Sequence, residues 1–271
     1  MIQPRVGSTL NHTVEDMLTT ATHEPRTIGT TAKRPSSHTQ DVASHIRDLQ
    51  QSSLAVARDL QRAKAGGQAQ EATRLAQKLE SIDNAAAAIA RRAARSIGKD
   101  RRLSISTLNA IFAQGAAPAQ LLSGDYRGEL LTTTVWAPLD AFAHAVSKLY
   151  FPWLGKRFEP ETSTGDNIFL PSARFAGHLA WPLYFGYKPY RDGLYTGFTF
   201  ATFTGPGTQD PGITTLKLDY DNPDNPGFLV QTVLDEVVQI THNYYLGKAF
   251  LWRSEGFRLA AFFALRPEIR R

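Results

Sequence analysis

The C-terminal half of the chain alternates apolar and polar residues in runs of strand length. In residues 213–221, Leu216, Leu218 and Tyr220 share one side, while charged residues occupy the other. Because successive side chains of a strand point to opposite faces, this alternation predicts a sheet with one dry face. By the same criteria we predict further strands over residues 194–204, 235–240, 244–252 and 257–265. The segments between these runs are short, which favours antiparallel neighbours.

Earlier runs extend the predicted sheet to residues 124–131, 153–158 and 166–170. About seven or eight antiparallel strands leave two edges with unpaired backbone groups, and closure into a barrel removes both edges. The last run of the chain has one continuous apolar face, formed by Phe257, Leu259, Ala261, Phe263 and Leu265. The pattern therefore predicts an antiparallel barrel or a strongly curved sheet.

The N-terminal half follows a helical period instead. Apolar or small residues recur at spacings of three and four on both sides of Gly66-Gly67, at Val42, Ile46, Leu49, Ser53, Val56 and Leu60, then at Leu75, Leu79, Ile82, Ala86, Ile89 and Ala93. This spacing predicts two helices of about 25 residues that pair as an antiparallel hairpin. Shorter helices are predicted over residues 104–114, and between strands over residues 139–150 and 172–185.

These patterns describe an α+β chain in three parts. Residues 1–40 are rich in Ser and Thr and have no sustained period, so we expect a disordered tail. Residues 41–102 form the helical hairpin, and residues 103–271 form the barrel with its inserted helices.

Composition limits the covalent links, the metal sites and the cellular location that we expect. The 271 residues include no cysteine, which excludes disulfides and thiolate metal sites. No apolar run approaches the roughly 20 residues that cross a bilayer as a helix, and charged residues stand where a signal peptide requires an apolar core. We therefore expect a cytoplasmic protein without a transmembrane segment.

Positive charge is concentrated in the hairpin. Residues 41–102 hold 12 Lys and Arg against 7 Asp and Glu, and many of these cations follow one another at the end of the second helix, at Arg91, Arg92, Arg95, Lys99, Arg101 and Arg102. Such a run can contact anionic lipid or nucleic acid. It can equally be a solvated face whose cations complement the helix dipole. No aromatic residue lies between these cations, which disfavours nucleic-acid binding by base stacking.

Three segments carry a resemblance to a known family. They are Gly124-x-Tyr126-x-Gly128, Trp153-x-Gly155-Lys156-x-Phe158 and the run from Tyr244 to Ala249. Over about residues 120–266 the chain resembles bacterial lipocalin-like (calycin-type) barrel proteins, some of which carry a Gly-x-Trp-x-Gly-Lys signature. Here the first glycine of that signature is missing, and the inserted helices are atypical. The resemblance implies a closed antiparallel barrel that holds an apolar ligand.

A barrel of about eight strands either fills its interior with side chains or keeps a cavity for one small ligand. Residues 245, 247, 249 and 251 share one strand face, and their small members would leave room inside or would pack closely against an inserted helix. The candidate wall residues are Tyr126, Trp136, Phe198, Phe200, Tyr245 and Phe263, and the candidate polar anchors are Lys217, Lys248 and Arg258.

Candidate catalytic residues also fall near the strands. They are Asp219, Asp235, Glu236 and His242, with Lys217 or Lys248 beside them. In an apolar barrel such groups would have shifted pKa values and could transfer protons. The alternative is that Lys217, Asp219 and Asp221 form the solvated side of an amphipathic strand. No metal site or cofactor is expected, because the acidic segment 219–225 lacks the glycine and the closing glutamate of a calcium loop.

The sequence leaves three functions open. The first is non-catalytic binding of an apolar or amphipathic small molecule in a barrel cavity. The second is an isomerase, cyclase or hydrolase that uses barrel carboxylates and a histidine. The third is a structural or interaction module that docks onto a second copy or another protein through the helical hairpin.

Overall fold

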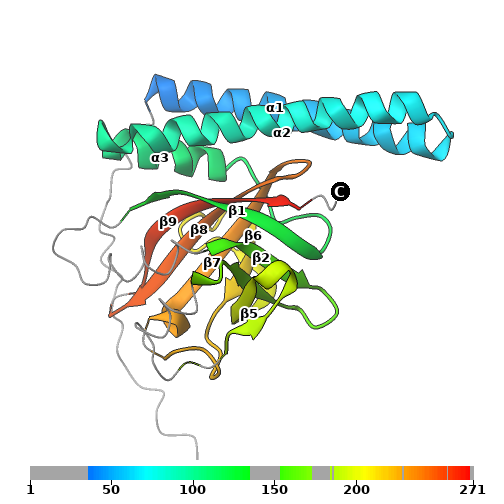
Figure 1. Ribbon diagram of the computed structural model, residues 1–271. Coiled ribbons are helices and arrows are strands. Elements are labelled where there is room, and N and C mark those ends of the chain that lie inside the picture. Colours follow the sequence, from blue (N-terminus) through cyan, green and yellow to red (C-terminus); the bar gives the residue numbers. More distant parts are fainter. Residues whose placement is uncertain are drawn as a thin grey trace, which may run out of the picture. The chain divides into compact units, whose positions relative to one another are not determined.

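The protein combines three N-terminal helices with a closed antiparallel barrel (Figure 1). The computed structural model describes residues 36–134, 153–172, 184, 186–227, 229–254 and 256–268. The predicted helix over residues 139–150, nearly all of the helix predicted over residues 172–185, and most of the predicted tail lie outside these residues.

The described strands follow the chain around the barrel in order. They are β1 (Gly124–Thr133), β2 (Trp153–Glu159), β3 (Thr164–Phe169), β5 (Tyr195–Pro206), β6 (Thr214–Asp219), β7 (Val233–Thr241), β8 (Tyr244–Arg253) and β9 (Gly256–Pro267). Each pairs antiparallel with the next, β9 pairs with β1, and the β3–β5 pairing completes the ring. The two-residue strand β4 (Lys188–Pro189) adds only to β5. The predicted α+β fold is confirmed, and of the two predicted forms of the sheet the structure has the closed barrel, with eight strands in the ring.

The helices begin and end where the sequence provides caps. α1 (Ser37–Ala65) starts after Ser36, whose hydroxyl oxygen accepts a hydrogen bond from Thr39 N at 3.2 Å. Gly67, with φ of 68°, turns the chain into α2 (Ala69–Arg95). α3 (Arg101–Phe112) is capped by the Asp100 carboxylate. The predicted hairpin is therefore present.

The helices cover the outer face of β7, β8 and β9. One apolar cluster joins Ile46 and the alanines of α2 to Leu108, Ile111 and Phe112 of α3 and to the outward residues Val238, Leu246 and Phe262. Ala86, Ala87 and Ala90 are fully buried there, because a methyl side chain lets the α2 backbone approach the sheet closely. The half of the hairpin around the Gly67 turn forms a separate cluster, made of Val56, Leu60, Ala63, Leu75, Leu79 and Ile82.

Polar contacts fix the hairpin to the turn between β7 and β8. The buried carboxylate of Asp83 accepts hydrogen bonds from Thr241 Oγ1 at 2.6 Å and from Asn243 N at 3.2 Å. On the other side of the turn, His242 N donates to Ser53 Oγ at 2.9 Å. Both helices therefore supply acceptors that satisfy the backbone and side chains of one turn.

Strand alternation separates the two faces of the barrel, with one departure from the sequence pattern. Ala261, Phe263 and Leu265 face the interior as predicted, but Leu259 packs on the outer cluster. The reason is a β-bulge: Ala249 pairs with Ala261 and Phe250 with Leu259, which leaves Ala260 as an extra residue. A shift of one residue moves every preceding side chain to the opposite face, so the predicted continuous face is interrupted.

Aromatic rings fill the interior where inward residues are small. A Cβ on Gly247 would lie 2.2 Å from the Phe263 ring, and one on Gly128 would lie 2.3 Å from the Trp153 ring. The small residues of β8 do face inward, but the space they leave is occupied by Phe263 rather than empty. Small and large side chains thus complement one another across the barrel.

Connections at the two ends of the barrel differ in length. Because the strands alternate in direction, residues 134–152, 170–194 and 220–232, together with the two-residue connection 254–255, connect strands at one end, which also contains Trp153. We call this the Trp153 end. The other end has shorter connections, residues 160–163, 207–213 and 242–243. Long loops on a rigid barrel are the usual place for a binding site.

The close contact between Gly247 and Phe263 gives a stability prediction. Gly247→Ala forces the Phe263 ring to move in a filled interior and should lower the free energy of unfolding by about 1–3 kcal/mol. Gly212→Ala is the matched control, because nothing lies within 4 Å of its Cβ, and it should change stability by less than about 0.5 kcal/mol. Urea unfolding measures both, and equal effects would contradict the described packing.

Asp83 gives a pH prediction. Burial raises the pKa of Asp83, and the hydrogen bonds from Thr241 and Asn243 offset only part of that effect. Because the folded protein then binds the proton more tightly than the unfolded chain, this contribution to stability is full below the ordinary value of 3.8 and is lost as pH rises through the folded-state pKa. The stability of the wild type relative to Asp83→Asn should therefore fall from acidic to neutral pH, as measured by urea midpoints. A difference that rises with pH would contradict this assignment.

Candidate functional site

A fully buried ion pair lies inside the barrel. Lys156 Nζ is 2.9 Å from Asp235 Oδ2, and each side chain is only 1% exposed. Asp235 faces inward because it alternates along β7 with Val233 and Val237, which belong to the interior cluster. Lys156 faces inward because it alternates along β2 with Phe158, and a register shift between Trp153 and Gly155 brings Trp153 to the same side.

Two neighbouring side chains complete the hydrogen bonds of the pair. Lys156 Nζ donates to Asn167 Oδ1 at 2.9 Å and to the Tyr220 hydroxyl. The Tyr220 hydroxyl donates a hydrogen bond to Asp235 Oδ2 at 3.3 Å and accepts one from Asn167 Nδ2 at 3.0 Å. We call Lys156, Asn167, Tyr220 and Asp235 the interior polar cluster. Trp153 adds a further hydrogen bond, from its indole nitrogen to Asn167 Oδ1 at 3.0 Å.

Aromatic rings surround the ammonium group of Lys156. Its Nζ lies 5.1–5.5 Å from the ring centroids of Trp153, Phe200, Tyr220 and Phe263. The faces of such rings attract a cation, most strongly where water is excluded. The rings therefore stabilise a charge that an aliphatic core would not accept.

Burial shifts both members of the ion pair toward their neutral forms. Burial lowers the pKa of Lys156, although the charge and the hydrogen bond of Asp235 act in the opposite direction. Burial likewise raises the pKa of Asp235, against the charge of Lys156 and the hydrogen bonds from Lys156 and Tyr220. Asp235 Oδ1 is buried without a hydrogen-bond partner among the described residues. The cluster thus retains one acceptor for a donor group.

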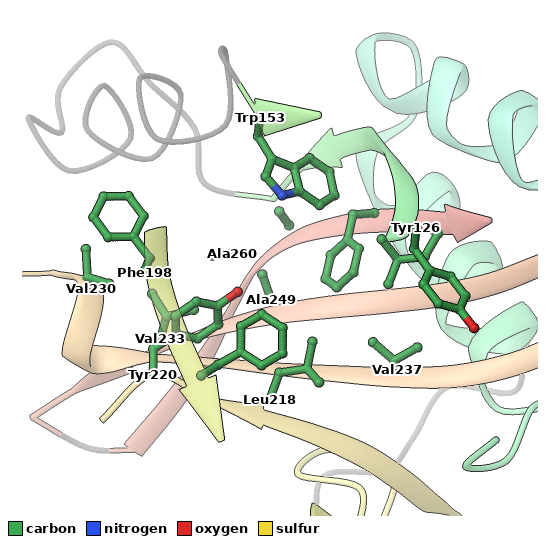
Figure 2. Close-up of a cluster of buried hydrophobic side chains, with 14 of the residues drawn as sticks. Tyr126, Trp153, Phe198, Leu218, Tyr220, Val230, Val233, Val237, Ala249 and Ala260 are labelled. Atoms are coloured by element: carbon green, nitrogen blue, oxygen red, sulfur yellow. The ribbon is translucent and has the colours of Figure 1, made fainter. Parts of the chain in front are cut away.

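A small cavity adjoins this cluster at the Trp153 end. Its volume is ≈20 Å³, enough for about one water molecule. Figure 2 shows Trp153, Phe198, Tyr220, Val230 and Val233 together in the barrel interior. These five residues line the cavity with Asn167 and Phe169, so its wall is apolar except for two members of the polar cluster.

Backbone strain is present at the cavity. Phe198 has φ of 54°, a left-handed conformation that is unusual for a bulky residue and marks a bulge in β5. Its N–H donates to Tyr184 OH at 2.8 Å, and its carbonyl accepts from Asn167 Nδ2 at 3.2 Å. Leu229, next to the cavity residue Val230, has φ of 77°. Such strain often accompanies binding sites.

The residues predicted from the sequence divide between the interior and the outside of the barrel. The residues that belong to the interior are Tyr126, Phe198, Phe200, Asp235, Tyr245 and Phe263. Lys217, Glu236 and Lys248 lie on the outer face, whereas Arg258 and His242 are exposed and Asp219 is half-buried. Trp136 lies outside the described residues. Only Phe198 among these lines the small cavity, and the predicted catalytic set is not brought together.

The outer lysines and Glu236 form an ionic row beneath a loop. Glu236 Oε1 accepts from Lys217 and from Thr208, through its backbone N–H at 2.7 Å and its hydroxyl at 2.6 Å. Lys248 Nζ donates to Asp210 at 2.6 Å and lies 4.4 Å from the Phe112 ring centroid. The alternative that Lys217, Asp219 and Asp221 form a solvated strand face is therefore wrong for Lys217, which the β5–β6 loop covers, whereas Asp219 is half-buried and Asp221 is exposed.

The sequence pattern does not identify most of the polar cluster. Lys156 belongs to the Trp-x-Gly-Lys segment, and its spacing of two from the inward residue Phe158 is the one signal that places it on the dry face. The alternation of residues 213–221 places Tyr220 on the face of Leu216 and Leu218 but indicates no polar role for it. Nothing in the sequence signals Asn167, whose contacts come from strands distant along the chain.

Other features of the described residues offer less chemistry. A groove of ≈430 Å³ lies outside the barrel between α1 and the β7–β8 turn, with Arg47, Leu54, Gln114 and His242 among its lining. Among the described residues no three His, Asp or Glu side chains gather in a way that could hold a metal ion. None of the described helices is both long and apolar enough to span a membrane.

The buried ion pair gives a prediction for a double-mutant cycle. Lys156→Met leaves Asp235 as an unpaired buried charge and should lower the free energy of unfolding by about 3–5 kcal/mol. Lys156→Met with Asp235→Leu replaces both charges by apolar groups and should recover most of that loss. Urea unfolding at neutral pH measures both variants. Losses that simply add would contradict a direct interaction between the two residues.

The comparisons with known proteins do not assign the chain to a family. No protein-family model matches the chain, and no curated protein matches it. A solved structure, described as a crystal structure of a protein from Thermomonospora curvata, is similar to it with 16% sequence identity and a TM-score of 0.39. The match covers 66% of this chain and 98% of the other.

Proposed function

We propose that the barrel binds a small apolar or amphipathic molecule at its Trp153 end without chemical change, in the manner implied by the resemblance to lipocalin-like proteins. The observation that carries the proposal is the interior polar cluster beside a cavity in an otherwise aromatic interior. A buried ion pair is rarely better for stability than apolar residues of similar volume. A role in recognition gives a reason for its presence.

The charges of the cluster specify the polar part of the ligand. Lys156 and Asp235 already neutralise one another, so a charged ligand group would remain uncompensated in the apolar interior. A neutral hydroxyl or amide can instead hydrogen-bond to Asn167 or Tyr220, the two members of the polar cluster in the cavity wall. The cavity wall around Phe169, Phe198 and Val233 suits an apolar remainder.

Ligand entry requires the cavity to enlarge. A typical small-molecule pocket has a volume of about 300–1,000 Å³, against ≈20 Å³ here. The segment around Phe198 is the element we expect to move, because its left-handed backbone is strained and release of that strain offsets part of the cost of opening. The ring of Phe198 packs against Phe169, Tyr184 and Tyr187, so its displacement opens the wall of the cavity.

The test uses prodan, a neutral naphthalene ketone whose emission shifts to the blue in apolar surroundings. Titration of the full chain should give a saturable blue shift. Val233→Phe fills the cavity and should weaken binding at least tenfold, whereas Leu54→Lys, which alters the outer groove, should not change it. Circular dichroism checks that both variants fold. Binding that is lost in Leu54→Lys and kept in Val233→Phe would place the probe outside the barrel and overturn the proposal.

Native mass spectrometry gives an independent readout for a carried ligand. The protein purified from its expression host should have an added mass that solvent extraction releases, and the Val233→Phe variant should lack it. An added mass that is equal in both proteins would contradict binding at the Trp153 end. Absence of any added mass together with no blue shift of prodan would exclude a carrier role.

A further inference from the structure

Five exposed cations surround the corner where α2 ends and α3 begins. They are Arg92 and Arg95 in the last turns of α2, Lys99 in the connection, and Arg101 and Arg102 in the first turn of α3. We call these five residues the basic corner. Arg91, beside them, is instead held by Glu129 of β1 through hydrogen bonds of 2.7–2.9 Å.

Acidic groups of the described residues do not neutralise the basic corner. None of its five cations forms an ion pair with another described residue. The one acidic residue within this segment is Asp100, and its carboxylate accepts the Leu103 N–H at 2.9 Å as the cap of α3. The corner is therefore a concentrated patch of positive charge.

The helix dipole explains only part of this arrangement. Arg92 and Arg95 lie near the C-terminus of α2, where cations are favourable. Arg101 and Arg102 lie at the N-terminus of α3, where the positive end of the dipole repels them. The helix dipole therefore does not account for Arg101 and Arg102. Cations at a position where the dipole repels them indicate an anionic binding partner outside the chain.

Apolar neighbours identify the kind of anionic partner. Ile97 and Leu103 lie between the cations and are only half-buried, while no aromatic residue occurs in residues 91–103. Aliphatic side chains among cations suit the interface of a membrane, where the charges meet phosphate headgroups and the apolar groups enter the acyl boundary. A nucleic-acid site would be expected to add aromatic stacking or a groove.

We propose that the basic corner docks the protein onto the surface of an anionic lipid membrane. This inference stands independently of the ligand site. The Arg91–Glu129 contact holds the end of α2 over β1, and Figure 1 shows α2 ending on the side of the barrel at which β1 ends, which is the Trp153 end. Docking through the corner therefore brings the end with the long connections toward the lipid surface.

The experiment is co-sedimentation of the full chain with phosphatidylcholine vesicles, with and without phosphatidylglycerol. Binding should require phosphatidylglycerol and should weaken as salt rises. Arg101→Gln with Arg102→Gln should lower the partition coefficient by about 10- to 30-fold, from the attraction of two cations to the surface. Loss through misfolding is not expected, because removal of these cations relieves repulsion at the start of α3; thermal unfolding checks this.

Arg58→Gln with Lys78→Gln is the matched control, since it removes two exposed cations from α1 and α2 away from the corner. It should leave the partition coefficient within about twofold of the wild type. Equal losses in the two double variants would overturn the proposal, because binding would then follow net charge alone. Tight binding of duplex DNA without binding to the anionic vesicles would also overturn it and assign the corner to nucleic acid.

Discussion

Closure of the sheet by the β3–β5 pairing is the constraint on which the rest of the structure depends. A closed ring has no free edge, so backbone groups are satisfied between strands, and it creates an interior that must be filled. Rings opposite Gly128, Gly165 and Gly247 fill most of that space. Any polar side chain that faces inward must then find its partners there, which Lys156 does through Asp235, Asn167 and Tyr220.

The hydrophobic periodicity of the sequence is sufficient to predict the strands and the hairpin. The period of a strand or of a helix is visible within one continuous segment, without knowledge of its partners. Periodicity was sufficient to place Leu216, Leu218 and Tyr220 on one inward face. It failed at Leu259, because the bulge at Ala260 depends on the register with β8. It failed at Lys217 for another reason: a residue opposite the dry face is solvated only if nothing covers it, and here the loop with Thr208 does.

The candidate site was less predictable than the fold because its members come from four strands or strand ends. Asp235 was identified as a candidate but was grouped with Glu236, its neighbour in sequence. The two carboxylates belong to different clusters, since adjacent strand residues face opposite ways: Asp235 joins Lys156 inside, and Glu236 joins Lys217 and Thr208 outside. Two adjacent residues of β7 therefore belong to buried ionic networks on opposite faces of the barrel wall.

The order in which the chain supplies its parts has a consequence for folding. The helices come first in the chain, but their apolar partners are on β7, β8 and β9, the final strands. β1 likewise pairs with β9, which follows it in the chain by more than a hundred residues. During synthesis on the ribosome, α1 can pair with α2 and β1 with β2, but the contacts of the helices with the sheet and the β1–β9 pairing form only after β7, β8 and β9 emerge. The barrel therefore cannot close before β9 has emerged, and the apolar faces that pack against β7, β8 and β9 stay uncovered until then.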